Sequence, residues 1–265
     1  MAAALEKLSL ETPTERLYLS YEGNFLLECS ATVVSCKRDG DVVRVAFDRS
    51  CFHPQGGGQP SDVGEIVSER TGEALKVAKA TYDFGTKVVS HAIAAPAEGD
   101  VDVDVGDVFA LRVDGETRDA FSRCHTAGHM VDSAMVRAGY SLPPNKGYHF
   151  LDGPYVEYKG TVPAEDRPAL VASLRTHFAA LKAEAIATTI VEMDKDEADE
   201  RLNRVQKNFD FGVFTDPTVR IVGVAGFECP CGGTHLRNTS DVADYTVTGI
   251  KVKKGVVRVK YDREK

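Results

Sequence analysis

Two histidines four residues apart are the first residues of this sequence that point to chemistry. His125 and His129 lie in residues 123–130, a run that is typical of a helix. Because four residues make slightly more than one helical turn, both imidazoles leave the same face and can converge on one metal ion. The same spacing is more often found in two buried or half-exposed histidines that bind nothing. The pair alone therefore decides little.

A second group of metal-ligating residue types lies about a hundred residues further on. Cys231 and His235 flank a Gly-Gly-Thr sequence and offer a thiolate and a third imidazole at close spacing. Cysteine and histidine are the usual ligands of structural and catalytic zinc. Together, His125, His129, Cys231 and His235 make a four-ligand set.

Three other chemistries use some of these residue types and are weighed as alternatives. A zincin protease needs a glutamate directly after its first histidine, and Thr126 stands there instead. A structural zinc ion, closed by four protein ligands with no position for water, stays open as an alternative. A cysteine hydrolase with Cys231 as nucleophile is a further alternative, although metal ligation uses all four residues at once. Cys124 and Cys229 could replace a ligand, but we expect both to be ordinary buried thiols.

A glycine-rich run covers residues 52–64 and contains Gly56-Gly57-Gly58-Gln59. Three glycines in a row carry no Cβ, so a backbone, a ligand or a ribose can approach closely and successive amides can point toward one oxygen. The plainer interpretation is a tight bend or bulge of a barrel, which a bare triple glycine favours.

In chain order, these motifs resemble the editing domain of alanyl-tRNA synthetase, and more closely its free-standing AlaX relatives. The resemblance rests on residues 52–64, His125 with His129, residues 146–150 with 153–158, and residues 231–235, and it runs from about residue 20 to the end. The editing domain of threonyl-tRNA synthetase has similar metal motifs but not the glycine-rich barrel. The glycine-rich run therefore favours the alanine system.

The resemblance implies a fold, a cofactor and a reaction. It implies a small N-terminal β-barrel followed by an α+β editing domain, with one Zn²⁺ per chain bound by His125, His129, Cys231 and His235. It also implies hydrolysis of the ester of serine, with glycine as a second candidate, at the acceptor end of aminoacylated tRNA(Ala). We expect hydroxyl donors to the oxyanion from Thr126 and Thr234, and substrate contacts from Gly56, Gly57, Gly58, Gln59 and His149. No general base is assigned, since sequence alone places neither His149 nor Glu157.

The elements that must position these residues divide the chain in two. In residues 1–114, β-prone runs at 31–34, 42–47, 87–90 and 108–111 are separated by turn sequences such as Asp39-Gly40, which predicts a small barrel or sandwich. Residues 115–265 predict an α+β domain. Its first expected element is a helix that ends at Gly139 and buries one stripe of side chains: Cys124, Ala127, Val131, Ala134 and Ala138. A hairpin around Asp152-Gly153 follows, and then a second helix with an apolar stripe in register: Leu170, Leu174, Phe178, Leu181 and Ala185. The remaining expected elements are strands at 189–193 and 219–225, a helix at 196–206 and a hairpin around Lys254-Gly255.

The charge of the chain limits how it can bind tRNA. A net charge of −8 argues against binding by bulk electrostatics, so contact must come from a local patch. Residues 249–265 hold seven basic and two acidic side chains. Period-two alternation puts Lys251, Lys253, Arg258 and Lys260 on one face as a candidate phosphate track. A solvated edge hairpin whose lysines discourage aggregation is an equal alternative.

Composition also indicates where such a protein works. The first residues show no apolar stretch of signal-peptide type, no run is long enough to span a membrane, and the six cysteines follow no disulfide framework. We therefore expect a cytoplasmic protein with no membrane partner. Without a phosphate loop of Walker type, we expect it to remove an amino acid rather than activate one. Two other functions stay open: a structural-zinc module that binds RNA or protein without catalysis, and editing of Ser-tRNA(Thr). The oligomeric state is also open.

Overall fold

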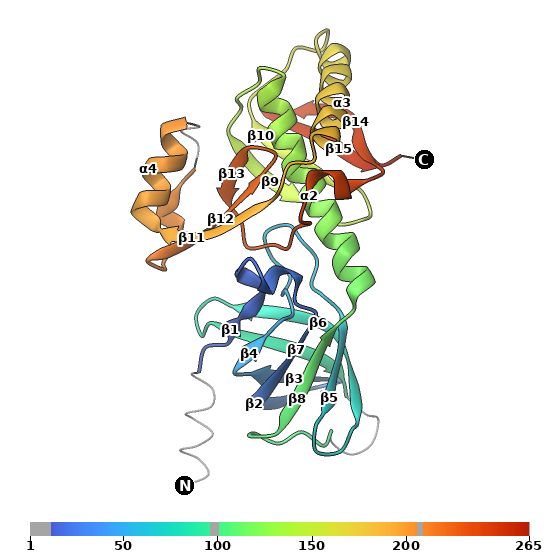
Figure 1. Cartoon of the computed structure of the whole chain (residues 1–265), viewed down its shortest axis with the longest axis vertical. Helices are drawn as coiled ribbons and strands as arrows, with labels where there is room; N and C mark the ends of the chain where they lie inside the picture. The colour runs from blue at the N-terminus through green and yellow to red at the C-terminus, as the bar shows by residue number, and fades with distance from the viewer. Residues whose placement is uncertain (1–11, 96–100, 206–208, 265) are drawn as a thin grey trace. The chain divides into compact units, whose positions relative to one another are not determined.

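The computed structural model describes residues 12–95, 101–205 and 209–264, and it shows a mixed α+β fold, as expected (Figure 1). Three parts of the sequence predictions lie outside the described residues: the start of the chain, Gln206 at the end of the helix predicted at 196–206, and Lys265 at the end of the basic run. The chain forms two compact units: Met1–Gly56 with Pro60–Arg118, and Gly57–Gln59 with Asp119–Lys265. The predicted boundary at residue 114 lies four residues before this division, and the separate role of each domain stays a prediction. Among the described helices, none is both long and apolar enough to cross a membrane.

The first unit is built on a closed six-stranded barrel, which confirms the expected N-terminal β-barrel. Its antiparallel strands follow the order β2 (Glu28–Asp39), β3 (Val42–Phe47), β7 (Val88–Ala94), β6 (Ala74–Asp83), β5 (Gly64–Ser68) and β8 (Val108–Val113). Branched and aromatic side chains fill the interior, as the alternation of buried residues along each strand requires. Two of these strands, β5 and β6, were not predicted.

Short elements and a buried ion pair close the first unit. A parallel pair joins β1 (Glu15–Arg16) to β4 (Arg49–Ser50), and the 3₁₀ turns η1 (Leu17–Leu19) and η2 (Gly23–Phe25) lie between them in sequence. Arg118 donates to both carboxylate oxygens of Asp62, at 2.9 and 3.0 Å from Nε, and to the carbonyl oxygen of Cys51 at 2.7 Å. These bonds hold the first turn of α2 (Gly115–Arg137) on the barrel residues of its own unit.

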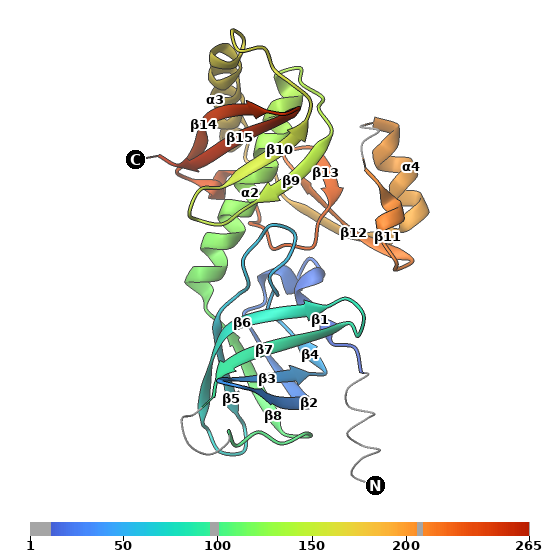
Figure 2. The ribbon, with the colours of Figure 1, turned by 180° about the vertical axis from the view of Figure 1, so that it is seen from behind.

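The second unit contains most of α2 and two antiparallel sheets (Figure 2). Helix α2 ends as predicted, with Gly139 at a φ of +83° two residues beyond it. Cys124, Ala127, Val131 and Ala134 are buried, but Ala138 lies past the last helical residue. The larger sheet has the order β14 (Tyr245–Lys253), β15 (Val256–Arg263), β10 (Tyr155–Lys159) and β9 (Pro144–Tyr148), which confirms both predicted hairpins.

The remaining elements complete the second unit. Helix α3 (Arg167–Glu184) buries Leu170, Leu174, Phe178 and Leu181, as predicted. The assignment of Ala185 to the same stripe is wrong, because this residue is an exposed left-handed C-cap with a φ of 50°. The smaller sheet has the order β11 (Thr189–Asp194), β12 (Thr218–Val224) and β13 (Phe227–Pro230). Helix α4 (Lys195–Val205) contacts β11 and β12, and the 3₁₀ turns η3 (Phe211–Val213) and η4 (Thr239–Val242) follow in sequence order.

Candidate metal centre

The four predicted ligands lie together in the second unit. One side-chain atom from each of His125, His129, Cys231 and His235 lies within 4.8 Å of all the others. The His125 and His129 Nε2 atoms are 3.3 Å apart, and Cys231 Sγ lies 3.6 Å from His125 Nε2 and 3.4 Å from His235 Nε2. Tetrahedral zinc at about 2.0–2.3 Å from nitrogen and sulfur ligands separates those ligands by roughly 3.3–3.6 Å. The donor set and these three distances therefore fit one zinc ion.

Local structure brings the two halves of the cluster together. The histidine pair lies on one face of α2, where four residues bring side chains back to the same side. Cys231 directly follows β13, and Arg220 of β12 donates to the carbonyl oxygens of Cys231 at 2.6 Å and Gly233 at 2.9 Å. A Cβ on Gly233 would overlap the ring of His125. Glycine at position 233 therefore lets the ligand loop lie against the helix.

Gln59 forms the layer behind the ligands. Its Oε1 accepts hydrogen bonds from His125 Nδ1 at 2.7 Å and from the Thr234 amide at 2.9 Å, and its Nε2 donates to Thr234 Oγ1 at 2.8 Å. A hydrogen on His125 Nδ1 leaves the lone pair of Nε2 directed at the other ligands, which is the usual arrangement of metal-binding histidines. Gln59 was predicted to contact substrate, and that role stays a prediction.

The hydroxyls of Thr126 and Thr234 are both buried and bonded within the protein. Thr126 Oγ1 donates to the Ser122 carbonyl oxygen at 2.7 Å, accepts from the Leu236 amide at 3.0 Å and lies 3.3 Å from Nδ1 of His235. Thr234 Oγ1 lies 2.7 Å from Ser122 Oγ in addition to its bond with Gln59. These contacts fasten the ligand loop to α2. The predicted donation of either hydroxyl to a substrate oxyanion is untested.

His149 lies beside the cluster, packed between small residues. Its ring stacks on His125 with centroids 4.2 Å apart, and its Nδ1 lies 2.5 Å from the Tyr261 hydroxyl oxygen. A Cβ on Gly128 or Gly147 would overlap the His149 ring. Burial lowers the pKa of His149 to about 3, with the charge of His129 adding to the effect. His149 is therefore a neutral imidazole at physiological pH.

The three glycines of the run differ in their surroundings. Gly58 has a φ of +81°, its carbonyl oxygen accepts from the His149 amide at 2.8 Å, and a Cβ there would overlap the carbonyl oxygen of Gly147. Gly57 has a φ of +56°, but no atom lies within 4 Å of the position that a Cβ would take, and Gly56 has only a distant neighbour in Pro54. Close approach therefore requires glycine at position 58, whereas position 57 requires it only for its backbone angle.

The neighbouring cysteines are outside the four-residue cluster. Cys124 is fully buried, and desolvation raises the pKa of its thiol to about 11, which agrees with an ordinary buried thiol. Cys229 is half-buried, and its Sγ lies 3.5 Å from Nδ1 of His129, the ring nitrogen that is not shared with His125. Cys229 therefore contacts a ligand rather than joining the cluster.

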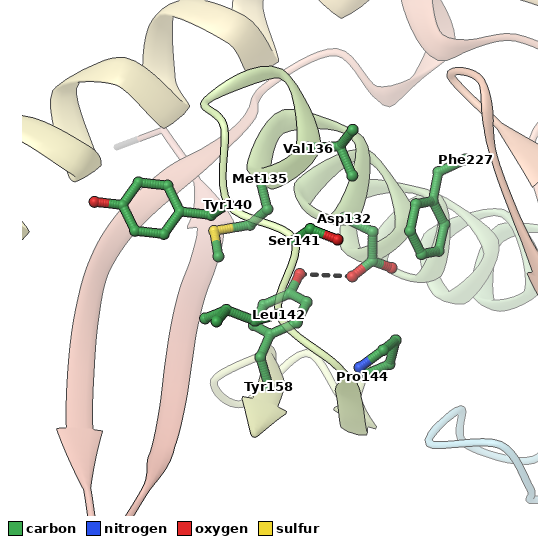
Figure 3. A pocket seen from close by; sticks show the side chains of 9 residues that line it. All are labelled: Asp132, Met135, Val136, Tyr140, Ser141, Leu142, Pro144, Tyr158 and Phe227. Carbon is green, nitrogen blue, oxygen red and sulfur yellow. Dashed lines mark hydrogen bonds between the residues drawn. The ribbon is translucent and has the colours of Figure 1, made fainter. Parts of the chain in front are cut away.

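A hollow beside α2 holds a carboxyl group that the sequence did not single out (Figure 3). Asp132, three residues after His129, accepts a hydrogen bond from the Tyr158 hydroxyl at 2.5 Å, with Met135 and Phe227 among the apolar lining. Desolvation raises the pKa of Asp132 to about 7, although the Tyr158 bond opposes the rise. Nothing in the local sequence marks Asp132, because its environment comes from α2, β10 and β13.

The four basic residues predicted to contact tRNA lie in the final hairpin. Lys251, Lys253 and Lys260 are exposed. Arg258 is half-buried and forms an ion pair with Glu157 at 2.7 Å. Glu157 therefore lies on the outer face of the larger sheet, and it is not a candidate base for the metal centre.

Comparisons with known proteins agree with this architecture. The family model "Threonyl and Alanyl tRNA synthetase second additional domain" matches residues 219–260, which include Cys231 and His235. The alanyl-tRNA editing protein AlaX-M of Methanosarcina mazei is 32% identical over 247 residues, covering 91% of this chain and 90% of the relative. AlaX-M of Methanosarcina acetivorans is 31% identical and covers 91% and 93%. The alanine–tRNA ligase of Thermofilum pendens is 33% identical, covering 93% of this chain but 26% of the ligase.

A barrel followed by an α+β unit with a His-His-Cys-His cluster, together with these matches, defines the class of editing proteins related to alanyl-tRNA synthetase. The chain belongs to the AlaX-M family of alanyl-tRNA editing proteins.

Proposed function

We propose that this protein is a zinc-dependent deacylase that edits mischarged tRNA(Ala) in trans, with seryl-tRNA(Ala) as its main substrate and glycyl-tRNA(Ala) as a second one. The observation that carries the proposal is the spacing of the four donor atoms, which fits zinc, in a chain that aligns along nine-tenths of an AlaX-M relative. Its partner is the acceptor end of the aminoacylated tRNA, and we expect it to act in the cytoplasm.

The bound zinc ion would supply Lewis acidity toward the ester or the attacking water. The residues of the chain would do the rest. Gln59 holds His125 in the tautomer and ring orientation that ligation needs, and Arg220 holds the Cys231 loop through two carbonyl oxygens.

His149 would serve as a hydrogen-bond donor rather than as a base. Burial raises the pKa of Tyr261 well above its ordinary value, so the Tyr261 hydroxyl keeps its proton and can donate it to His149 Nδ1 at 2.5 Å. The imidazole hydrogen then sits on Nε2. A neutral imidazole N–H on a ring that stacks on His125 would suit an ester oxygen that gains negative charge in the transition state.

Selectivity must come from the side chain of the aminoacyl group, since seryl- and alanyl-tRNA(Ala) share everything else. An apolar pocket would at best tolerate the serine hydroxyl, whereas a site with polar groups that need this hydroxyl leaves them unpaired when alanine enters. The backbone amides of Gly56, Gly57 and Gly58 are candidate partners. Thr126 and Thr234 are also candidates, but each would have to exchange a bond it already makes within the protein.

The test is a deacylation assay on purified seryl-tRNA(Ala) and alanyl-tRNA(Ala), run side by side with a measurement of metal content. We expect one zinc per chain and at least about a hundredfold faster clearance of the seryl ester. At about 1.4 kcal/mol per tenfold in rate, this difference corresponds to more than one hydrogen bond that the alanyl ester cannot make. Equal rates on the two esters would indicate a general esterase instead of an editor.

One further substrate and a buffer control address the alternatives. Seryl-tRNA(Thr), supplied at the same concentration, should be cleared more slowly than seryl-tRNA(Ala); the reverse order would assign the protein to threonine editing. A structural-zinc module that only binds RNA would protect the ester, so slower hydrolysis than in buffer would replace the proposal with a binding function.

A further inference from the structure

Four planar side chains form one continuous stack on the outer face of the larger sheet. The rings of Phe150 and Tyr148 have centroids 4.6 Å apart at an angle of 15°, and those of Tyr148 and Tyr155 are 5.2 Å apart at 17°. The guanidinium carbon of Arg258 lies 3.8 Å from the centre of the Tyr155 ring. The aromatic column, defined as Phe150, Tyr148, Tyr155 and Arg258, therefore runs from the loop after β9 across β10 to β15.

The sheet itself holds this column in place. Tyr148 of β9 and Tyr155 of β10 are directly paired across the two strands, and Glu157 is paired with Arg258 of β15. The Glu157 carboxylate accepts from Arg258 Nε at 2.9 Å and from Nη2 at 2.7 Å, which orients the guanidinium over the Tyr155 ring. The column is thus ordered before any partner binds, so a partner that stacks on it meets little ordering cost.

The same face carries most of the positive charge of the sheet. Residues paired across neighbouring strands share a face of the sheet. Lys251 is paired with Arg258 and Lys260 with Tyr155, so both lysine side chains lie on the same face as the aromatic column. The strand residues on this side comprise six basic and two acidic side chains: Lys146, Lys159, Lys251, Lys253, Arg258 and Lys260, with Glu157 and Asp262. In a chain with a net charge of −8, this face is a local basic patch that suits a polyanion.

We propose that the aromatic column and its lysines bind unpaired RNA nucleotides, with a base stacked on the outer face of Phe150 and phosphates along the lysines. Among the described residues, Phe150 stacks on one ring only, Tyr148, and it is half-buried at the end of the column. Successive bases stacked on aromatic rings, with Arg and Lys along the backbone, are how proteins hold single-stranded nucleic acid. A column that ends in an aromatic ring offers the next stacking position to a base.

The inference rests on the proposed function, because it says where the unpaired 3′ end of the substrate tRNA lies. β9 is an edge strand of its sheet, and His149 falls between Tyr148 and Phe150 in sequence. The His149 side chain stacks on His125 at the metal centre, whereas its two neighbours join the column. An RNA strand on the column would have to pass this end of β9, beside the Gly58 that contacts Gly147 and His149, for its terminal ester to reach the cluster.

The binding test uses a tryptophan reporter and RNA without an amino acid. The chain has no tryptophan, so Phe150→Trp introduces a single one at the end of the column. We expect its fluorescence to be quenched by a short single-stranded RNA ending in CCA, and not by an abasic oligomer of the same length and charge. Equal responses to the two oligomers would mean that the patch recognises charge alone, and quenching by neither, or by an acidic peptide instead, would overturn the assignment.

The matched variants separate stacking from folding and from catalysis. Phe150→Leu should weaken binding of the base-bearing oligomer about tenfold, within the range for one stacked base, and raise KM on seryl-tRNA(Ala) with kcat and zinc content unchanged. Phe84→Leu is the control, because Phe84 is 86% exposed on the barrel and outside the column. An unchanged KM and unchanged RNA binding in Phe150→Leu would refute the inference. Quenching by the base-bearing RNA without any deacylation would instead support RNA binding at the aromatic column and refute the proposed function.

Discussion

Replacing Gln59 with leucine tests the layer behind the metal centre. Leucine has a similar volume but no polar atoms, so the His125 Nδ1–H and the Thr234 amide would both lose the acceptor that they share. Thr234 Oγ1 would keep its contact with Ser122 at 2.7 Å. Each buried donor left without a partner costs about 1–3 kcal/mol. The variant should therefore lose roughly 2–6 kcal/mol of folding stability by the same principle, less where water reaches either group.

The effect on metal binding is the sharper result. Without Gln59 Oε1, His125 Nδ1 loses the 2.7 Å bond that fixes its hydrogen, and losses of this kind lower metal affinity about 10–100-fold. The assay is competition for Zn²⁺ against a chromophoric chelator, with thermal unfolding measured in parallel with and without metal. Gln59→Glu should restore affinity, because a carboxylate accepts from the same Nδ1–H and suits a histidine that ligates a cation.

Gln55 provides the matched control for this variant. It lies in the same run four residues earlier and is exposed, so Gln55→Leu should change neither zinc affinity nor stability. A folded Gln59→Leu protein with the affinity of the parent would refute the view that Gln59 orients His125. A loss in Gln55→Leu of the same size would show that the loop, and not the amide, is responsible.

Three further variants test other parts of the structure. Cys231→Ala should lose zinc on dialysis, whereas Cys229→Ala should keep it, because Cys229 Sγ contacts Nδ1 of His129; the opposite pattern in a metal analysis would reverse the ligand assignment. Gly58→Ala should destabilise the protein well beyond the ~1 kcal/mol expected for Gly57→Ala, since both residues have positive φ but only position 58 lacks room for a Cβ; equal denaturant midpoints would contradict this. The carboxyl of Asp132 has a pKa of about 7 in the folded chain against 3.8 ordinarily, so the folded state binds more protons than the unfolded state between these two pH values. The free energy of unfolding should therefore fall as pH rises from about 4 to 7, by up to about 4 kcal/mol. Asp132→Asn should remove that decline in pH-dependent unfolding curves, and an identical slope in both proteins would rule it out.

Local patterns predicted the fold class and most of its elements. The boundaries of β3 match the expected run at residues 42–47, and both hairpins of the larger sheet lie at the expected turns. β6 was missed because its exposed alanines and lysines do not alternate with a strong apolar face in sequence, and its strand state is set by pairing with β5 and β7. Ala185 was placed in a helix by its spacing, although the helix had already ended in a left-handed residue.

Residue type and spacing alone determined the candidate ligands, because a histidine pair at one helical turn and a Cys–His pair in one short loop together supply the four donors that zinc prefers. Tertiary structure decided what surrounds them. Gln59 is 66 residues from His125 and 175 from Thr234, and Arg258 is 101 residues from the Glu157 that holds it. No local pattern encodes such pairs. They arise where buried or half-buried polar atoms must find hydrogen-bond partners once the chain has folded, and the partners are whichever groups the fold brings within reach.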